Sequence, residues 1–348
     1  MFRSKILFIV GAGASCEAGL PSSVALKDSI AEKVDLRFAD GFNLTSGDPR
    51  ILQALRQHVA STSPGNTNIV EFQKAGWRLR DALPQALSID NLIDAHRGDD
   101  KLELCAKLGI AASIIDAEQA SMLYVDEDTG GKLDFRTAVK SWYHFFMQIL
   151  TENVAKKDVS QILENVSFIT FNYDRCIEQF LHLALENYYG LERGEAAAIV
   201  NRLDIFHPYG VVGGLPRLLH GQRGDHFGRM ATTNLLSAAK QIKTFTERIE
   251  DDTALNRIRD RVQAATVIVF LGFGFHQQNL DLLQPANRPV ATRVFATTIG
   301  ISAPDRLALE GQLGEMLRVD PRYRPDIVLS GTTCAGIFQE FWRTFSRV

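Results

Sequence analysis

Small residues follow the first apolar run of the chain, and they are suited to close contact with a phosphate group. The run Ile6–Val10 leads into Gly11-Ala12-Gly13-Ala14-Ser15, and Gly19-Leu20-Pro21 follows soon after. Small side chains let the backbone approach a ligand, and the N–H groups at the start of a helix attract anions. Cys16 stands where the dinucleotide fingerprint has its third glycine, and no Gly-Lys-Ser/Thr of a P-loop follows. We expect nucleotide binding here; the alternative is a tight strand–helix turn without a ligand.

A second set of polar residues ends the apolar run at 166–171. Thr170, Asn172 and Asp174 alternate with aromatic residues in Thr170-Phe171-Asn172-Tyr173-Asp174. Ligands of open parallel sheets bind outside the carboxyl ends of the strands. An asparagine there can orient a water molecule or a sugar hydroxyl, and an aspartate can accept a hydrogen bond from a carboxamide or a ribose. The alternative is that Asn172 or Asp174 caps the following helix.

Two further apolar runs end in residues that could reach the same edge of a sheet. His207 directly follows the run at 203–206, while Gly272, Gly274 and Asn279 follow the run at 266–271. A histidine titrates near neutral pH and can act as a general base, and His220 competes with His207 for that role. The remaining histidines are expected at the surface or packed against helices: His58, His96, His144, His182, His226 and His276.

Six short apolar runs predict the strands that would bring these residues together. They lie at Ile6–Val10, Val166–Phe171, Leu203–Phe206, Thr266–Leu271, Arg293–Thr298 and Ile327–Leu329. Stretches of helical length separate most of them, which indicates a parallel sheet with helices on both faces. The connection after the first strand is far too long for a simple crossover.

That long connection has helical periodicity in several pieces. Helices are expected at Ser22–Glu32, Arg50–Val59, Ile69–Ala82, Ile89–His96, Leu102–Ala120 and Phe135–Glu152, and later at Ala238–Val262 and Ala303–Leu317. We therefore predict an α/β protein with a Rossmann-like parallel sheet, formed by residues 1–35 and 160–348. Residues 36–159 would form a large helical insertion.

The composition is that of a soluble globular protein with a substantial core. The 348 residues are 45% hydrophobic and 23% charged, with a net charge of −3. Proteins that bind the nucleic-acid backbone or anionic membranes favour basic surfaces, so we expect neither partner. The apolar run at the N-terminus is too short for a signal peptide. Four cysteines without a paired spacing predict no zinc site, no disulfide framework and a reducing cytoplasm: Cys16, Cys105, Cys176 and Cys334.

The order of these motifs resembles that of the sirtuin-like superfamily, in particular its branch of bacterial NAD-cleaving defence proteins. The similar pattern consists of Gly11-Ala12-Gly13-x-Ser15, Gly19-Leu20-Pro21, Thr170-x-Asn172-x-Asp174, a histidine at a strand end, and Gly272-x-Gly274. Ser88-Ile89-Asp90 also resembles a motif in the helical insertion of that branch. The resemblance covers roughly residues 5–345.

The chain differs from the deacylases of this superfamily on the side that binds the peptide. It lacks cysteine pairs for their zinc ribbon, Ser22-Ser23-Val24 replaces their Asp-Phe-Arg, and Phe171 replaces the glutamine before their asparagine. These differences favour hydrolysis of NAD over transfer to an acylated peptide. Tyr209-Gly210 stands where the family has His-Gly, so either His207 or His220 would supply the histidine. We favour His207, because it directly follows the predicted strand.

The resemblance implies an NAD glycohydrolase that uses NAD as its substrate and no metal. Asn172 would orient the attacking water or hydroxyl, Asp174 would bind the nicotinamide carboxamide, and His207 would be the general base. The remaining residues that we expect to contact NAD are Gly11, Ala12, Gly13 and Ser15 at the diphosphate, Gly272 and Gly274 at the adenosine, and Gly19, Pro21, Thr170 and Asn279. The alternatives are a sensor that binds NAD or ADP-ribose without turnover, and a sirtuin-type deacylase.

The same resemblance implies a cytoplasmic effector of abortive infection against phages. Its relatives suggest a homo-oligomer and a HerA-type hexameric ATPase as a partner, without direct contact to nucleic acid or a membrane. The aromatic run Ser141–Met147 in the insertion is either a surface for such a partner or part of the core.

Overall fold

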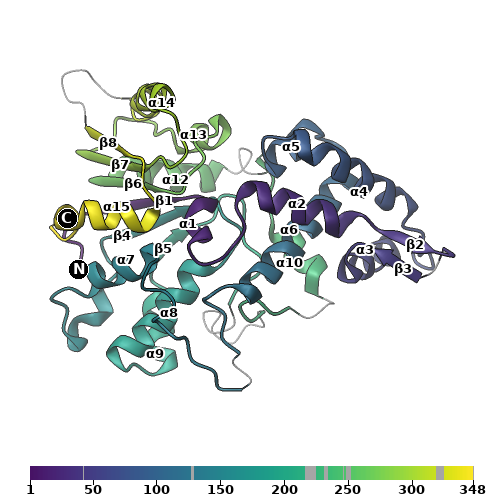
Figure 1. Cartoon of the computed structure of the whole chain (residues 1–348), viewed down its shortest axis with the longest axis horizontal. Coiled ribbons are helices and arrows are strands. Elements are labelled where there is room, and N and C mark those ends of the chain that lie inside the picture. The colour runs from purple at the N-terminus through teal and green to yellow at the C-terminus, as the bar shows by residue number, and fades with distance from the viewer. Residues whose placement is uncertain are drawn as a thin grey trace.

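In the computed structural model, a six-stranded parallel sheet forms the core of the half of the molecule that holds both chain ends (Figure 1). The structure describes residues 1–41, 43–126, 129–215, 225–230, 234–245, 247, 252–318 and 325–347. The strands are β1 (Ile6–Val10), β4 (Val166–Thr170), β5 (Asp204–Phe206), β6 (Val267–Leu271), β7 (Arg293–Thr297) and β8 (Asp326–Ser330). Each of these six strands lies at one of the six apolar runs from which strands are expected.

The order of the strands, β5-β4-β1-β6-β7-β8, is that of a Rossmann-like fold. The chain starts in the middle, adds β4 and β5 on one side of β1, and then crosses to add β6, β7 and β8 on the other. Phe8 in β1 lies opposite both Phe168 in β4 and Val269 in β6. The predicted fold class is thus confirmed. The strand order reverses between β1 and β6, where sheets of this kind bind their ligands.

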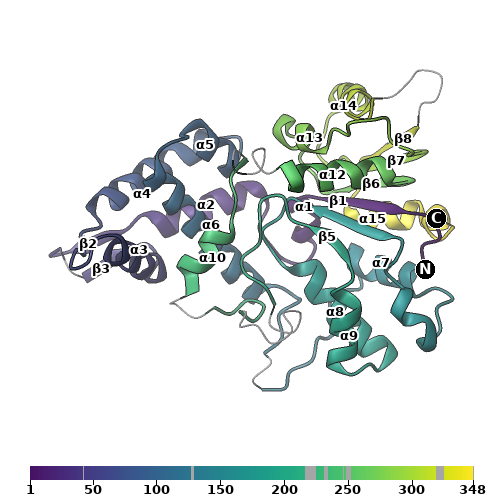
Figure 2. The same cartoon turned by 180° about the vertical axis from the view of Figure 1, so that it is seen from behind.

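Helices cover both faces of the sheet (Figure 1 and Figure 2). Along β1, Leu7 and Ile9 join one hydrophobic cluster, and Phe8 and Val10 join the other, as the two-residue period of a strand requires. The first cluster includes residues of α12 (Asp252–Ala264), α13 (Gln277–Leu283) and α14 (Ala303–Met316), together with residues of the helices beside the sheet that are described below. Those of the second are α1 (Ala12–Cys16), α7 (Trp142–Thr151), α8 (Cys176–Tyr189), α9 (Arg193–Val200), α15 (Cys334–Glu340) and α16 (Trp342–Phe345).

The aromatic run at the start of α7 belongs to the core. Trp142, Tyr143 and Phe146 are each only 1% exposed. The ring of Phe146 meets that of Phe8 in β1 edge-on, with 5.4 Å between the centroids. Of the two alternatives for this run, core packing is therefore the one that these three residues bear out.

A distant carboxylate fixes the start of α7, so the helix predicted over 135–152 begins only at Trp142. Glu17 Oε2 accepts a hydrogen bond from Trp142 N at 2.7 Å, and Glu17 Oε1 accepts one from Ala335 N at 2.9 Å. One side chain thus satisfies N–H groups in the first turns of both α7 and α15. The residues just before Trp142 form turns instead of a helix.

Replacement of Glu17 by alanine should lower the free energy of unfolding by about 1–2 kcal/mol, because two helix starts lose their acceptor. Urea denaturation followed by circular dichroism measures the change. Glu32→Ala is the matched control, since Glu32 is exposed on its helix. A loss for Glu17→Ala no larger than that of the control would contradict the capping role.

A second group of helices packs beside the sheet, and we call it the helical body (Figure 1). It contains α2 (Ser23–Val34), β2 (Arg37–Ala39), β3 (Asn43–Ser46), α3 (Pro49–Thr62), α4 (Val70–Ala82), η1 (Leu83–Gln85), α5 (Ile89–Ala95), α6 (Asp100–Ala120) and α10 (Leu235–Gln241). The antiparallel β2–β3 hairpin was not among the expected elements. A short 3₁₀ helix, η2 (Lys156–Gln161), precedes β4.

The helices that pack together are not the same set as those within residues 36–159, the expected insertion. Helix α2, from the N-terminal part of the expected sheet domain, packs against α4 and α6 of the helical body. Helix α10, which comes after β5, packs against α3 and α6, whereas α7 packs on the sheet. The single helix expected over 238–262 is interrupted after Gln241, where Lys243 N donates to Tyr209 O at 2.9 Å. Within the described part of the chain, no helix is both long and apolar enough to cross a membrane.

Candidate functional site

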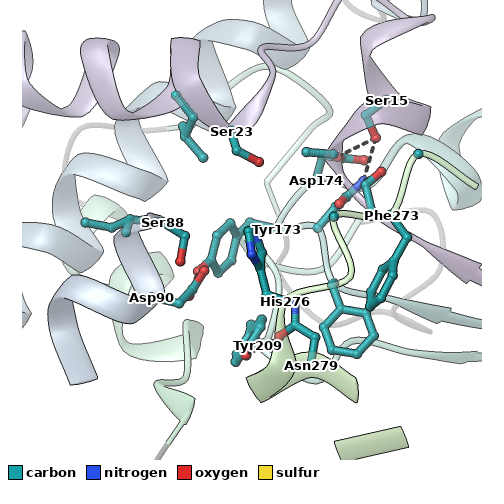
Figure 3. A pocket seen from close by; sticks show the side chains of 18 of the residues that line it. Ser15, Ser23, Ser88, Asp90, Tyr173, Asp174, Tyr209, Phe273, His276 and Asn279 are labelled. Carbon is teal, nitrogen blue, oxygen red and sulfur yellow. Dashed lines mark hydrogen bonds between the residues drawn. The ribbon is translucent and has the colours of Figure 1, made fainter. Parts of the chain in front are cut away.

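A cavity open to solvent lies at the carboxyl ends of β1, β4 and β6, between the sheet and the helical body (Figure 3). This is the edge at which the strand order reverses, where sheets of this kind bind their ligands. The residues that follow the three strands line one wall, and α2, α5 and α6 line the other. Of the residues expected to contact NAD or act on it, the lining includes Gly11, Ala12, Ser15, Pro21, Asn172, Asp174, Gly272, Gly274 and Asn279.

Three buried side chains from two strand ends form a hydrogen-bond network in the cavity wall (Figure 3). Ser15 Oγ donates to Asp174 Oδ2 at 2.8 Å and accepts from Asn172 Nδ2 at 2.9 Å. Asn172 Nδ2 also donates to Gly11 O at 3.0 Å. Because the Ser15 hydroxyl has a single proton, donation to the carboxylate leaves it as an acceptor toward the amide.

This network determines which way the amide of Asn172 faces. A backbone carbonyl can only accept, so the amide atom next to Gly11 O must be Nδ2. Both protons of Nδ2 are then used, and Oδ1 has no partner in the described part of the chain. The Asn172 side chain therefore offers a fixed acceptor oxygen to a ligand in the cavity.

Thr170 supports Asn172 from inside the protein, and Asp174 supports it through Ser15. Thr170 does not line the cavity; its Oγ1 accepts from Asn172 N at 3.3 Å. Asp174 Oδ1 accepts from Cys176 N at 3.1 Å, so each carboxylate oxygen already has a protein donor. Burial raises the pKa of Asp174, and the hydrogen bonds from Ser15 and Cys176 oppose that rise.

The glycines after β1 and β6 pack against each other. A Cβ on Gly13 would come within 2.8 Å of Gly272 Cα, and one on Gly272, whose φ is +55°, within 2.1 Å of Ala14 N. The N–H groups of Gly11, Gly13 and Ala14 donate to backbone carbonyls. The small residues thus permit close contact between two loops, and these three N–H groups are not free for a phosphate. Gly13 does not line the cavity.

His207 lies behind Asn172 and outside the cavity lining. Its Nδ1 is 3.3 Å from the backbone oxygen of Asn172, and its Nε2 is 2.9 Å from Glu178 Oε1. Burial lowers the pKa of His207, but the attraction of Glu178 outweighs it, so that the pKa is raised. Gly19, at a turn with φ of +95°, also lies outside the lining. The competing candidate, His220, lies outside the described residues.

The ion pair of His207 with Glu178 should make stability depend on pH. A histidine whose pKa is raised in the folded state contributes stability that is complete below its unfolded pKa of about 6.5 and is lost as the pH rises through the folded value. The difference in unfolding free energy between wild type and His207→Gln should therefore be larger at about pH 6 than at about pH 9. His144→Gln is the control. Burial lowers the pKa of His144, so the difference in unfolding free energy between wild type and this variant should instead be larger at about pH 9 than at about pH 6. An equal difference at both pH values would contradict a charged His207.

Several lining residues were not expected to contact a ligand. His276, assigned from the sequence to the surface or to helix packing, lines the cavity instead, and this expectation is wrong. Tyr173 donates to Asp90 Oδ1 of α5, and Tyr209 donates to Asn279 Oδ1 at 2.6 Å. His276 lies only two residues beyond Gly274, so its place in a loop at a strand end was the signal that could have identified it.

Two hydrogen bonds join the helical body to the sheet across the cavity. Asp90 accepts from Tyr173, and Asp94 Oδ2 accepts from Gln278 Nε2 at 3.1 Å. Ser88 caps α5 by accepting from Asn91 N at 3.1 Å, which fixes the start of the helix that carries both carboxylates. The motif Ser88-Ile89-Asp90 therefore lies in the cavity wall.

No protein-family model matches the chain, and no curated protein is significantly similar to it in sequence. The described residues contain no group of three or more histidine, cysteine, aspartate or glutamate side chains placed to hold a metal ion. The cavity instead combines an oriented amide, buried carboxylates, an imidazole and aromatic rings, among them Phe171 and Phe273 with centroids 5.1 Å apart.

Proposed function

We propose that the protein is an NAD glycohydrolase that cleaves the nicotinamide–ribose bond of NAD to give nicotinamide and ADP-ribose. The observation that carries the proposal is the fixed orientation of Asn172, whose Oδ1 is left without a protein partner in the cavity wall. An amide oxygen held in this way can accept a hydrogen bond from a water molecule or a ribose hydroxyl and so orient it. The resemblance of the motifs to the NAD-cleaving branch of the sirtuin-like superfamily supports the same proposal.

The reaction needs little from the protein besides positioning and one base. The bond between C1′ and the pyridinium nitrogen breaks with its electron pair going to nitrogen, so nicotinamide leaves as a neutral molecule. A water oxygen bonds to C1′ and loses a proton. Asn172 orients the water, while a base takes the proton. Gly272 and Gly274 line the cavity on the side proposed for the nucleoside, and the aromatic rings in the wall offer apolar surface for its base.

The wider biological role that we propose rests on the resemblance alone. The protein would be a cytoplasmic effector of abortive infection against phages, because unrestrained loss of NAD would kill the cell that makes it. It would act as a homo-oligomer, with a HerA-type hexameric ATPase as its partner.

A second candidate function is a sensor that binds NAD or ADP-ribose without turnover. It is favoured by one observation: His207, the expected base, does not line the cavity. A sirtuin-type deacylase is the third candidate, and it would consume NAD only together with an acylated peptide.

Chromatography of NAD, nicotinamide and ADP-ribose during incubation with the full chain tests the proposal. Stoichiometric release of nicotinamide and ADP-ribose without any peptide is the expected result. Tight binding of NAD by calorimetry with no products over long incubation, with and without the ATPase partner, would favour the sensor. Turnover that requires an acyl-lysine peptide would favour the deacylase.

A further inference from the structure

Two histidines, His207 behind Asn172 and His276 in the cavity lining, differ in whether a ring nitrogen is free to accept a proton. A general base needs a ring nitrogen with a free lone pair that can reach the ligand. His207 and His276 differ in both respects.

The partners of His207 are both acceptors. Its Nδ1 is paired with a backbone carbonyl oxygen, Asn172 O, and its Nε2 with a carboxylate oxygen, Glu178 Oε1. A carbonyl and a carboxylate cannot donate, so each ring nitrogen must carry a proton. The ring is then an imidazolium with no lone pair to accept a further proton. The raised pKa of His207 agrees with this arrangement.

His276 has the opposite surroundings. Its ring lies against the backbone at Gly274, where an added Cβ would come within 3.1 Å of Nε2, and it lines the cavity. Neither ring nitrogen forms a hydrogen bond to the described part of the chain. Burial lowers the pKa of His276, so the neutral ring, with one free lone pair, dominates at neutral pH.

The other titratable groups of the described lining are occupied by protein partners. Asp90 accepts from Tyr173, and Tyr209 donates to Asn279. Asp174 accepts from Ser15 and from the backbone of Cys176. His276 is the histidine of this lining, and its free ring nitrogen is left for a ligand because neither ring nitrogen has a protein partner in the described residues (Figure 3).

We infer that His276 is the imidazole that contacts bound NAD and takes the proton of the attacking water, and that His207 is a positioning residue for Asn172. This inference rests on the proposed function. The water oxygen bonds to C1′, the C1′–N bond breaks with its electron pair going to nicotinamide, and the water proton moves to the free nitrogen of His276. His207 donates to the Asn172 carbonyl from behind and holds the residue that orients the water.

Acylation of histidines by diethyl pyrocarbonate, mapped by mass spectrometry, tests the contact in the native protein. The reagent attacks neutral, accessible imidazoles, so His276 should react and His207 should not. Saturating ADP-ribose should protect His276. Reaction of His276 at the same rate with and without bound ADP-ribose would overturn the contact, as would reaction at His207 in place of His276.

Glutamine substitutions test the roles, because glutamine can donate a hydrogen bond but cannot accept a proton at neutral pH. His276→Gln and His276→Ala should both lower kcat by about 10²-fold or more, the range for loss of a general base. His207→Ala should also lower kcat, and His207→Gln should recover part of the loss by restoring a donor to Asn172 O. His144→Gln, on a half-buried residue of α7 outside the cavity, is the control that should keep wild-type activity.

Failure of this inference is distinguishable from failure of the proposed function. Wild-type kcat in folded His276→Gln, while the wild-type protein releases nicotinamide, would overturn the role of His276 and leave the function standing. A wild-type protein that neither binds nor cleaves NAD would overturn both. Thermal unfolding of each variant separates loss of activity from loss of the fold.

Discussion

Asn172→Ala should abolish nicotinamide release while the protein stays folded and binds NAD. The side chain contributes one free acceptor, Oδ1, whose direction is fixed because Nδ2 is held by Gly11 O and Ser15 Oγ. Removal of a single pre-oriented group at a reaction centre typically costs about 10²–10³ in kcat. NAD makes most of its proposed contacts elsewhere in the cavity, so its dissociation constant should change far less than kcat.

The measurement is the initial rate of nicotinamide release, with NAD affinity determined by calorimetry on the same preparation. Asn187→Ala is the matched control, since Asn187 is exposed on α8 and lies outside this cavity. Turnover at the wild-type rate in Asn172→Ala would rule out its role in orienting the nucleophile. Loss of folding, binding and turnover together would make Asn172 a structural residue.

The hydrogen-bond network holds the amide of Asn172 and supplies a donor to the carboxylate of Asp174, and Ser15→Ala tests how far Ser15 serves each of them. The alanine removes the hydroxyl that bridges Asn172 Nδ2 and Asp174 Oδ2, but it leaves the bond from Asn172 to Gly11 O. The amide keeps one of its two anchors, and the buried carboxylate loses one of its two donors. A loss of kcat smaller than that of Asn172→Ala is expected if Ser15 acts through Asn172.

The sheet and its polar edge could be predicted because their signals are local in the sequence. A strand buried on both faces is a continuous apolar run, and the residues after it reach the carboxyl edge whatever the rest of the fold does. Asn172, Asp174, Gly272 and Asn279 all lie at the cavity for this reason.

The parts that could not be predicted depend on contacts between distant segments. The start of α7 is fixed by Glu17, and the glycines after β1 are required by the backbone at Gly272. Whether a given side chain of a loop faces the cavity also depends on contacts with distant segments. His207 points to Glu178, whereas Tyr209, two residues later, lines the cavity together with His276.

A buried ion pair contributes to the joint between the helical body and the sheet, and Glu118→Ala should lower the free energy of unfolding by about 3–5 kcal/mol. Glu118 in α6 is fully buried, and Arg175, which directly follows Asp174, is 1% exposed. The carboxylate accepts hydrogen bonds from the backbone N, Nε and Nη2 of Arg175 and from Gly228 N. Removal of Glu118 would leave a buried guanidinium without its counter-charge.

Chemical denaturation of Glu118→Ala, Arg175→Met and the double variant measures this effect. Each single variant should be strongly destabilised, and the double variant should be more stable than the sum of the two losses predicts, because no buried charge remains in it. Glu71→Ala is the control, since the pair of Glu71 with Lys74 is exposed and its loss should leave stability unchanged. Additive losses in the double variant would mean that Glu118 and Arg175 stabilise the protein independently. Coupled losses would show that Glu118 in α6 and Arg175, which adjoins Asp174, stabilise the protein through their interaction with each other.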